Sequence, residues 1–202
     1  MIFLPSGLEF QLNPKASIPK AAVAQLPVQT VKNYFQLLED TLLGSLLPPY
    51  RKTIKRKAVA TSKFYLFDPG VANVLLNRMT LKIGTPEYGK SFEHLVWREL
   101  SSYLGYHRSP FDLFYWRTSQ QKEEVDFILH EKGSQGPALA IEVKSKRNVV
   151  QSDLRGLEIF AEEFPRVRKL VVSNESEKRL ASGVEIWPIA EFLTALWKKE
   201  LL

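Results

Sequence analysis

Residues 124–144 read EVDFILHEKGSQGPALAIEVK, two largely apolar runs on either side of a glycine-containing turn. Each run has the length and side-chain content of a strand, and the turn between them predicts an antiparallel hairpin. If this hairpin is symmetric about Ser134, Asp126 lies opposite Glu142. Like charges directly across a ladder destabilise a sheet unless something neutralises them. The stretch therefore predicts a pair of strands that carries a charged, functional site.

A divalent cation between the two acids would neutralise their charge, and Mg²⁺ is the ion that we expect. Mg²⁺ prefers one or two carboxylates together with water and phosphate oxygens, and Mn²⁺ is the alternative ion. We expect Asp126, Glu142 and the backbone carbonyl of Val143 to be the metal ligands. Lys144 points to the same face as Glu142 and is the expected catalytic residue, which orients or helps to deprotonate water, or counters charge on a phosphate.

A simpler interpretation is a solvated strand face with an ion pair between Glu124 and Lys144. The apolar context of Glu142 and Lys144, among Leu139, Ala140, Ile141 and Val143, weakens it, because buried charges need a partner. Glu93 is the expected fourth group. It follows Gly89 by four residues on a predicted helix, so the neighbouring turn on its face bears no side chain. An exposed helical glutamate is the alternative for Glu93.

The rest of the C-terminal part predicts an α/β fold with the order α-β-β-β-α-β. Thr85-Pro86 is an N-cap and first-turn pair. The expected helices span 85–104, 152–164 and 189–198, with a short one near 71–76, and the expected strands span 113–117, 124–130, 138–145, 169–173 and 184–187.

The front of the chain predicts a separate, winged-helix-like unit over residues 1–63, followed by a domain over 64–202. A short helix at 21–25 and a longer one at 28–43 outline a helix-turn-helix, and 44–50 and 51–65 are the two strands of a wing. No acid occurs between residues 51 and 63, and such a basic run would bind phosphates. A solvated hairpin that joins two domains fits equally well. The residues expected to bind nucleic acid are Arg51, Lys52, Lys55, Arg56 and Lys57, together with Lys146 and Arg147 beyond the site.

Composition limits the class of protein. The chain has 202 residues, 45% of them hydrophobic, a net charge of +6 and no cysteine, so disulfide scaffolds and thiolate zinc sites are excluded. The basic balance suits a nucleic acid partner. No apolar run approaches the roughly 20 residues of a membrane span, so we expect a soluble cytoplasmic protein with no membrane partner.

Taken together, the motifs resemble a known family. Asp126, Glu142-x-Lys144 and Glu93, in this element order, resemble the PD-(D/E)xK nuclease superfamily, with Val125 where the motif has proline. The chain looks more closely like the DUF4143 domain. The segments that carry this second resemblance are Lys63 to Val71, Tyr88 to His94, Tyr115 to Arg117, Glu124 to Phe127 and Ile141 to Ser145.

The resemblance implies a restriction-endonuclease-like core, a DNA-related role and a Mg²⁺ or Mn²⁺ ion. The DUF4143 domain ends a family of prokaryotic AAA-type ATPases, and residues 17–50 are similar to the winged-helix piece that precedes it. Because few residues precede Leu12, we expect a truncated or remodelled chain, or a separately encoded partner of an AAA-type ATPase.

A competing motif lies at Gly84-Thr85-Pro86-Glu87-Tyr88-Gly89-Lys90-Ser91, which matches the phosphate-binding pattern G-x-x-x-x-G-K-S/T after a strand-like segment at 80–83. Glu87 would place a carboxylate among amides that cradle phosphate, and Pro86 removes a donor. Three functions thus remain: a metal-dependent nuclease that hydrolyses phosphodiester bonds, which we favour; a catalytically silent DNA- or protein-binding module; and a nucleotide binder.

Overall fold

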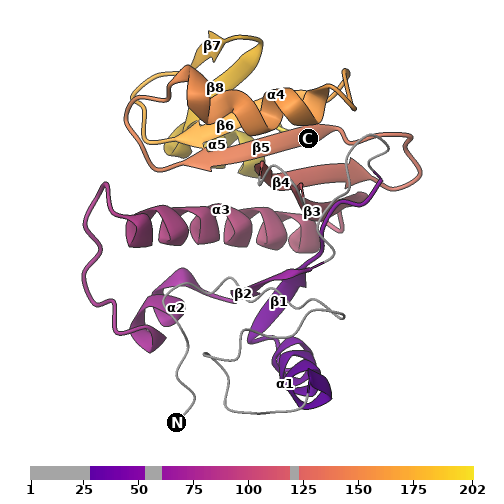
Figure 1. Cartoon of the computed structure of the whole chain (residues 1–202), viewed down its shortest axis with the longest axis vertical. Helices are drawn as coiled ribbons and strands as arrows, with labels where there is room; N and C mark the ends of the chain where they lie inside the picture. Colours follow the sequence, from indigo (N-terminus) through magenta and orange to yellow (C-terminus); the bar gives the residue numbers. More distant parts are fainter. Residues whose placement is uncertain (1–27, 53–60, 119–122) are drawn as a thin grey trace.

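The computed structural model describes residues 28–52, 61–118 and 123–202 (Figure 1). The described part of the chain holds five α-helices, one short 3-10 helix and eight strands. In chain order they are α1 (Val28–Asp40), β1 (Gly44–Leu47), β2 (Lys63–Leu66), α2 (Pro69–Leu75), α3 (Pro86–Tyr106), β3 (Phe111–Arg117), β4 (Glu124–Glu131), β5 (Leu139–Lys144), η1 (Gln151–Leu154), α4 (Arg155–Ala161), β6 (Arg168–Ser173), β7 (Arg179–Ala181), β8 (Val184–Pro188) and α5 (Ile189–Trp197).

The main sheet has six strands in the order β3-β4-β5-β6-β8-β7. β3, β4 and β5 are antiparallel neighbours, whereas β5, β6 and β8 run parallel. Antiparallel neighbours can be joined by short turns, but parallel ones need a crossover, and η1 with α4 supplies it between β5 and β6. The mixed sheet confirms the predicted α/β class. The sequence analysis missed β7, a three-residue edge strand that pairs with β8.

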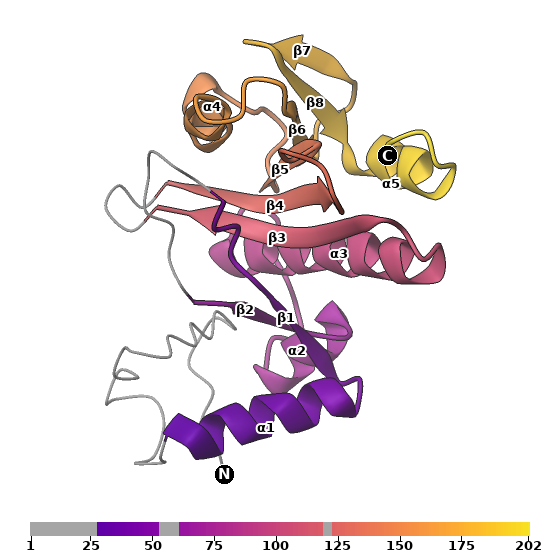
Figure 2. The ribbon, with the colours of Figure 1, turned by 90° about the vertical axis from the view of Figure 1, so that its right-hand side faces the viewer.

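Helices α3 and α5 cover one face of the sheet and α4 covers the other (Figure 2). The apolar residues Phe92, Val96 and Leu100 recur every four positions on α3 and pack against Phe127 and Ile141. Thr85 Oγ1 accepts a hydrogen bond from the Tyr88 N–H at the start of this helix. The predicted N-cap is therefore confirmed, and α3 extends slightly beyond the predicted end.

The helix predicted over 152–164 is wrong in its outline. The structure has a 3-10 turn and then a short α-helix that ends at Ala161. The Asp153 carboxylate accepts a hydrogen bond from the Val150 N–H and forms an ion pair with Lys146. A side chain that satisfies the backbone locally in this way favours a tight turn over a regular helix start. The apolar face still packs on the sheet as predicted, through Leu157 and Phe160.

Below α3, the strands β1 and β2 form a two-stranded sheet in which Gly44 lies opposite Leu66. Val31 and Phe35 of α1 pack beneath it. The strand predicted over 51–65 is confirmed only at its end: β2 begins at Lys63 and pairs with β1, as predicted, whereas Arg51 and Lys52 lie outside any strand. The boundary predicted between residues 63 and 64 thus falls inside β2. The short helix predicted at 21–25 lies outside the described residues.

None of the helices in the described part of the chain combines the length and apolar character that a bilayer span requires.

The contact between α4 and β4 generates a first prediction. A Cβ added at Gly156 would lie 2.1 Å from the backbone oxygen of Glu124, so Gly156→Ala must push the helix away from the strand. We expect a loss of about 1–3 kcal/mol in the free energy of unfolding, measured by urea denaturation. Gly105→Ala on α3 is the matched control, because its Cβ would meet nothing within 4 Å, and it should gain about 0.5–1 kcal/mol. Equal stability of the two variants would contradict this packing.

Candidate active site

The β4–β5 hairpin has the predicted register from Phe127 onward, but the predicted pair of Asp126 with Glu142 lies beyond the end of the ladder. Phe127 pairs with Ile141, Ile128 with Ala140 and Leu129 with Leu139, so the hairpin is symmetric about Ser134. The register ends at Phe127. Asp126 and Glu142 therefore come directly after the last pair, where the two strands stop sharing a ladder.

A bulge in β4 sets the direction of the first carboxylate. Phe114 of β3 pairs with Ile128, whereas Trp116 pairs with Val125, so Asp126 and Phe127 both lie across from Tyr115. Bulges of this kind re-aim side chains and often lie next to functional sites. Here Val125 joins the core under α4, while the Asp126 side chain turns toward Lys63 and toward the backbone of β5 at Val143.

Asp126 is buried and anchored to the neighbouring strand. The residue is 8% exposed. Its Oδ2 accepts a hydrogen bond of 2.8 Å from the Val143 N–H, and its Oδ1 lies 3.8 Å from Lys63 Nζ. Burial raises the pKa of Asp126 well above its ordinary value, and the nearby carboxylates of Glu142 and Glu93 raise it further. The Asp126 carboxyl is thus a group that a cation would readily ionise.

Glu142 has an oxygen without a partner. The residue is 7% exposed, and strand alternation places it on the same face as Ala140, which packs toward α4. Its Oε1 accepts a hydrogen bond of 2.5 Å from Lys144 Nζ, whereas its Oε2 is buried with no hydrogen-bond partner. Burial raises the pKa of Glu142 to about 7, against the lowering effect of Lys144. The interpretation as a solvated strand face is therefore wrong, because the side chains of Asp126 and Glu142 are both buried.

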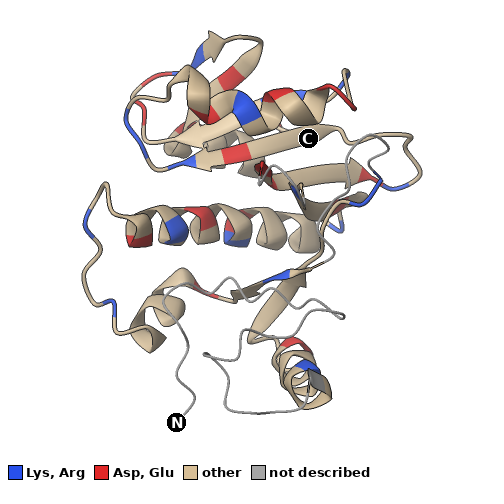
Figure 3. Cartoon of the chain, in the orientation of Figure 1, with Lys and Arg blue, Asp and Glu red and all other residues tan. Residues whose placement is uncertain are grey.

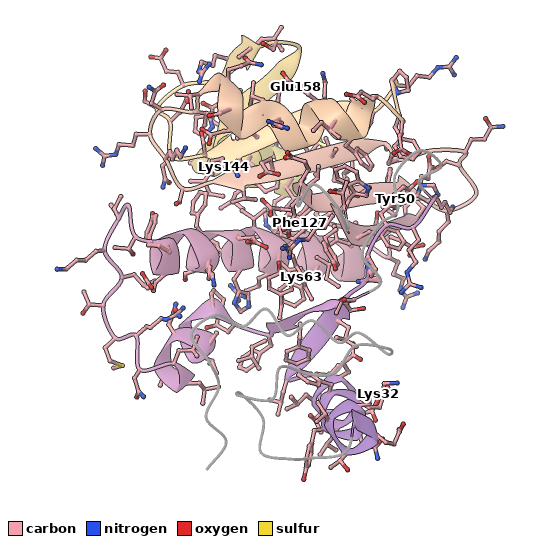
Figure 4. All side chains as sticks on the ribbon, in the orientation of Figure 1. Lys32, Tyr50, Lys63, Phe127, Lys144 and Glu158 are labelled. Carbon is pink, nitrogen blue, oxygen red and sulfur yellow. The ribbon has the colours of Figure 1, made fainter. Side chains whose placement is uncertain are left out.

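Lys63 of β2 is the second cation of the site, and the sequence analysis assigned it no role there. Its Nζ lies 3.0 Å from Glu93 Oε1 and 2.5 Å from Glu124 Oε1. The Tyr65 hydroxyl also donates to Glu93 Oε1, at 2.5 Å. Figure 4 labels Lys63 on β2 and Lys144 on β5.

These contacts correct two alternatives. Glu93 is not an exposed helical glutamate, because its side chain is 21% exposed and contacts Lys63. Burial raises the pKa of Glu93, but Lys63 and the Tyr65 hydroxyl outweigh burial, so the net pKa is lowered and Glu93 stays ionised. The ion pair between Glu124 and Lys144 is wrong as well: Glu124 contacts Lys63, and Arg117 at 3.7 Å.

One signal in the sequence points to Lys63. It precedes Phe64-Tyr65-Leu66, and all four residues of β2 are buried. A charge embedded in an apolar strand is the same signal that singled out Glu142. The basic run before it hid this signal, because Lys63 reads there as one more exposed lysine.

The cluster as a whole holds more acids than bases. Its four carboxylates come from α3, β4 and β5, on which Figure 3 marks acidic positions in red. The cations in contact with them are two lysines and one arginine. Within 28–52, 61–118 and 123–202, no three His, Asp or Glu side chains form a ready-made metal-binding group. Mg²⁺ often uses just one or two carboxylates, and the free Glu142 Oε2 beside Asp126 meets that smaller requirement. The residues present thus fit one divalent ion.

A pocket between β2, α2 and α3 borders the cluster. Lys63, Tyr65 and Glu93 form part of its lining, and Arg78 and Lys90 line it as well. Arg78 and Lys90 place positive charge around this pocket, and positive charge attracts an anionic ligand.

The residues expected to bind nucleic acid have mixed positions. Arg51 and Lys52 are exposed, and Lys52 Nζ lies 2.9 Å from His130 Nε2. Lys146 and Arg147 are exposed just beyond β5, and Lys146 pairs with Asp153 at 2.6 Å. Lys55, Arg56 and Lys57 lie outside the described residues.

The phosphate-loop motif lacks its structural context. Residues 80–83 form no strand, which makes that part of the expectation wrong. The amides of the segment are also in use: Thr85 N–H donates to Lys82 O, Tyr88 N–H to Thr85 Oγ1 and Gly89 N–H to Thr85 O. Amides that cap α3 are not available to cradle a phosphate.

Comparison with known proteins finds two family matches. The model of DUF4143, a domain of unknown function, matches residues 88–192, and that of DUF8612, also a domain of unknown function, matches residues 9–82. The DUF8612 match ends in the linker between α2 and α3, and the DUF4143 match begins in the first turn of α3. No solved structure matches the chain.

Two curated proteins are similar to part of the chain. These are the uncharacterized protein Rv2008c of Mycobacterium tuberculosis and the uncharacterized protein Mb2031c of Mycobacterium bovis, each 32% identical over 107 residues. The aligned part is 52% of this chain and 23% of each relative. The chain thus spans less than a quarter of the length of these relatives.

The raised pKa of Glu142 generates a prediction about stability and pH. Between pH 4.5, its ordinary pKa, and about 7, the folded state binds more protons at Glu142 than the unfolded state does, so folding stability falls as pH rises through this window. We expect Glu142→Gln to remove this slope, which is on the order of 3 kcal/mol across the window. The measurement is urea denaturation in EDTA from pH 4.5 to 8.

The comparison between wild type and variant reports Glu142 together with its effect on Asp126, whose pKa is raised by burial and by the Glu142 carboxylate. Burial lowers the pKa of His94 and His130, so these residues favour folding as pH rises, but they do so equally in both proteins. A stability difference between wild type and variant that is independent of pH would show that Glu142 titrates normally.

Proposed function

The chain belongs to the DUF4143 family of domains of unknown function, and we propose that it is a metal-dependent deoxyribonuclease whose active site is the charged cluster at the end of the β4–β5 ladder. The observation that carries the proposal is the buried Glu142 Oε2, which has no partner although it lies beside a second buried carboxylate. Most buried side-chain oxygens are hydrogen-bonded, so this one needs an explanation, and a bound cation is the explanation that we propose.

The topology supports a PD-(D/E)xK assignment of the core. An α-helix, three antiparallel strands, a crossover helix and a fourth strand parallel to the third follow one another as α3, β3, β4, β5, α4 and β6. Asp126 precedes Glu142 and Lys144 on adjacent strands, as in that motif, with Val125 in place of proline. Fold alone does not make an enzyme, so the argument depends on the site residues.

In this proposal Asp126, Glu142 and the Val143 carbonyl hold Mg²⁺ or Mn²⁺. The ion, when bound, polarises the phosphate and lowers the pKa of a bound water. Asp126 is fixed for this role by the Val143 N–H, which holds one of its oxygens. Glu142 is held by Lys144 at Oε1 and leaves Oε2 free.

Lys144 acts as a cation rather than as a base. Burial lowers its pKa, but the carboxylates of Glu142 and Asp126 outweigh burial and raise the pKa above its ordinary value. A protonated Lys144 orients the attacking water and stabilises charge that develops on the phosphate. Glu93 assists from α3, where it is ionised and holds Lys63 beside Asp126.

The charge distribution supports DNA as the substrate. The net charge is +6, and exposed Lys146 and Arg147 directly follow the strand that carries Glu142. Arg51 and Lys52, with Lys55 to Lys57, would add phosphate contacts from the segment before β2. The absence of cysteine suits a reducing, cytoplasmic setting, which we include in the proposal.

A second candidate function is a catalytically silent DNA- or protein-binding domain of an AAA-type ATPase system. The observation that favours it is the neutralisation already present: Glu93 and Glu124 contact Lys63, and Glu142 contacts Lys144. A cluster held together in this way can serve to stabilise the fold alone.

A cleavage assay tests the first function. We expect nicking of plasmid DNA with Mg²⁺ or Mn²⁺ that EDTA abolishes, and a loss of at least about 100-fold in Asp126→Asn or Lys144→Ala, a scale set by the loss of one transition-state contact. Lys132→Ala is the control, because Lys132 is exposed and pairs with Asp112 rather than with an acid of the cluster. Folding of each variant is checked by circular dichroism. No product from linear, branched or single-stranded DNA with either ion would favour the binding domain.

The basic segment generates a prediction about DNA affinity. Changing Arg51, Lys52, Lys55, Arg56 and Lys57 to Ser should weaken duplex binding and reduce the slope of log affinity against log salt by up to about 4. Fluorescence anisotropy at several salt concentrations measures both quantities.

A charge-matched control separates this segment from net charge. It changes five exposed basic residues elsewhere to Ser: Lys82, Arg108, Lys132, Arg166 and Lys198. This control should bind DNA with a salt slope closer to that of the wild type. Equal slopes in the two variants would mean that the segment has no specific role.

A further inference from the structure

Lys63 is surrounded by three carboxylates, whereas an ordinary ion pair has one. Its side chain is 5% exposed, and its Nζ lies 3.0 Å from Glu93 Oε1, 2.5 Å from Glu124 Oε1 and 3.8 Å from Asp126 Oδ1. The acids come from two different elements, α3 and β4, while the lysine comes from β2. Three carboxylates therefore converge on one buried ammonium group.

This arrangement is that of a cation site filled by a side chain. An ammonium group has three N–H donors and no acceptor, which matches three surrounding acids. The ring of Tyr115 lies 5.1 Å from Nζ and adds a cation–π contact. Lys63 Nζ lies 3.8 Å from Asp126 Oδ1, and Asp126 is one of the two carboxylates that would hold the first ion. A second ion held by Asp126 would therefore compete with Lys63 for the same acids.

We propose that Lys63 is a built-in replacement for a second divalent ion, so that the active site takes one ion at Asp126 and Glu142 rather than two. The inference rests on the proposed function, because it presumes the first ion. Lys63 is a positioning residue in this account. It holds Glu93 and Glu124 beside the site and neutralises them without a metal.

A purely structural role makes different predictions. A lysine that merely ties β2 to the sheet could be replaced at a cost in stability, with no change in the number of ions bound. A lysine that fills a cation site leaves, when it is removed, a pocket of three carboxylates that attracts an ion of its own. The number of bound ions therefore distinguishes the two roles without any measurement of activity.

The experiment compares Lys63→Met with two controls. Lys63→Arg keeps the charge, and Lys132→Met removes an exposed lysine that contacts Asp112 at 3.5 Å. Calorimetric titration with Mn²⁺ should give one ion for the wild type and for both controls, and two for Lys63→Met. Thermal unfolding should show that Lys63→Met is the least stable without Mn²⁺ and gains more in Tm than the wild type when Mn²⁺ is added, because two ions bind the folded chain.

Each outcome decides the matter. One ion in both the wild type and Lys63→Met, with equal gains in Tm, overturns the role of Lys63 and leaves the nuclease proposal standing. If the wild type binds no ion, the metal site of the proposed function is excluded. If Lys63→Met then binds one, that ion still supports a cation site at Lys63. If neither protein binds an ion, both proposals are overturned. If Lys63→Met stays unfolded even in Mn²⁺ while Lys63→Arg folds, an ion does not replace the ammonium and the inference fails.

Discussion

Four carboxylates lie close together under the cover of α3, β2 and the sheet, and the cost of burying their charge is the constraint that organises this part of the molecule. Lys63 and Lys144 offset that cost from two directions, one on β2 and one on β5. Because Lys63 is supplied by β2, the β1–β2 sheet is tied to the acids of α3 and β4. Lys63 is thus one of the contacts that link the front of the chain to the DUF4143 region, beside the hydrogen bond from Tyr65 to Glu93.

The same constraint connects structure to chemistry. Neutralisation is incomplete, since Glu142 Oε2 has no partner and burial raises the pKa values of both Asp126 and Glu142. A site that holds protons at its carboxylates for lack of cations is a site that a divalent ion can occupy by displacing those protons. The bulge, the burial of the acids and the unpaired oxygen are thus the three features on which our proposal of a cation site depends.

Much of this could be predicted from the sequence, and the failures have physical causes. The hairpin register followed from two apolar runs around Ser134, because a one-residue slip would turn every side chain over. The bulge that places Asp126 and Phe127 across from Tyr115 was not predictable, since one extra residue leaves the apolar pattern almost unchanged. Lys63 was missed because its burial depends on acids that lie 30 and more residues away in sequence. The predicted helix at 152–164 is a 3-10 turn followed by a short α-helix because of side-chain contacts of Asp153. The spacing of apolar residues in the sequence does not reveal such contacts.

The central claim is that Asp126 and Glu142 hold one divalent ion, whose binding displaces the proton that burial favours at Glu142. The most direct measurement is the number of protons released when Mn²⁺ binds, from calorimetry at pH 6.5 in buffers of different ionisation enthalpy. The account predicts binding of one ion with release of about one proton or more, and a smaller release for Glu142→Gln. Binding without proton release, or no binding of Mn²⁺ at all, would contradict it.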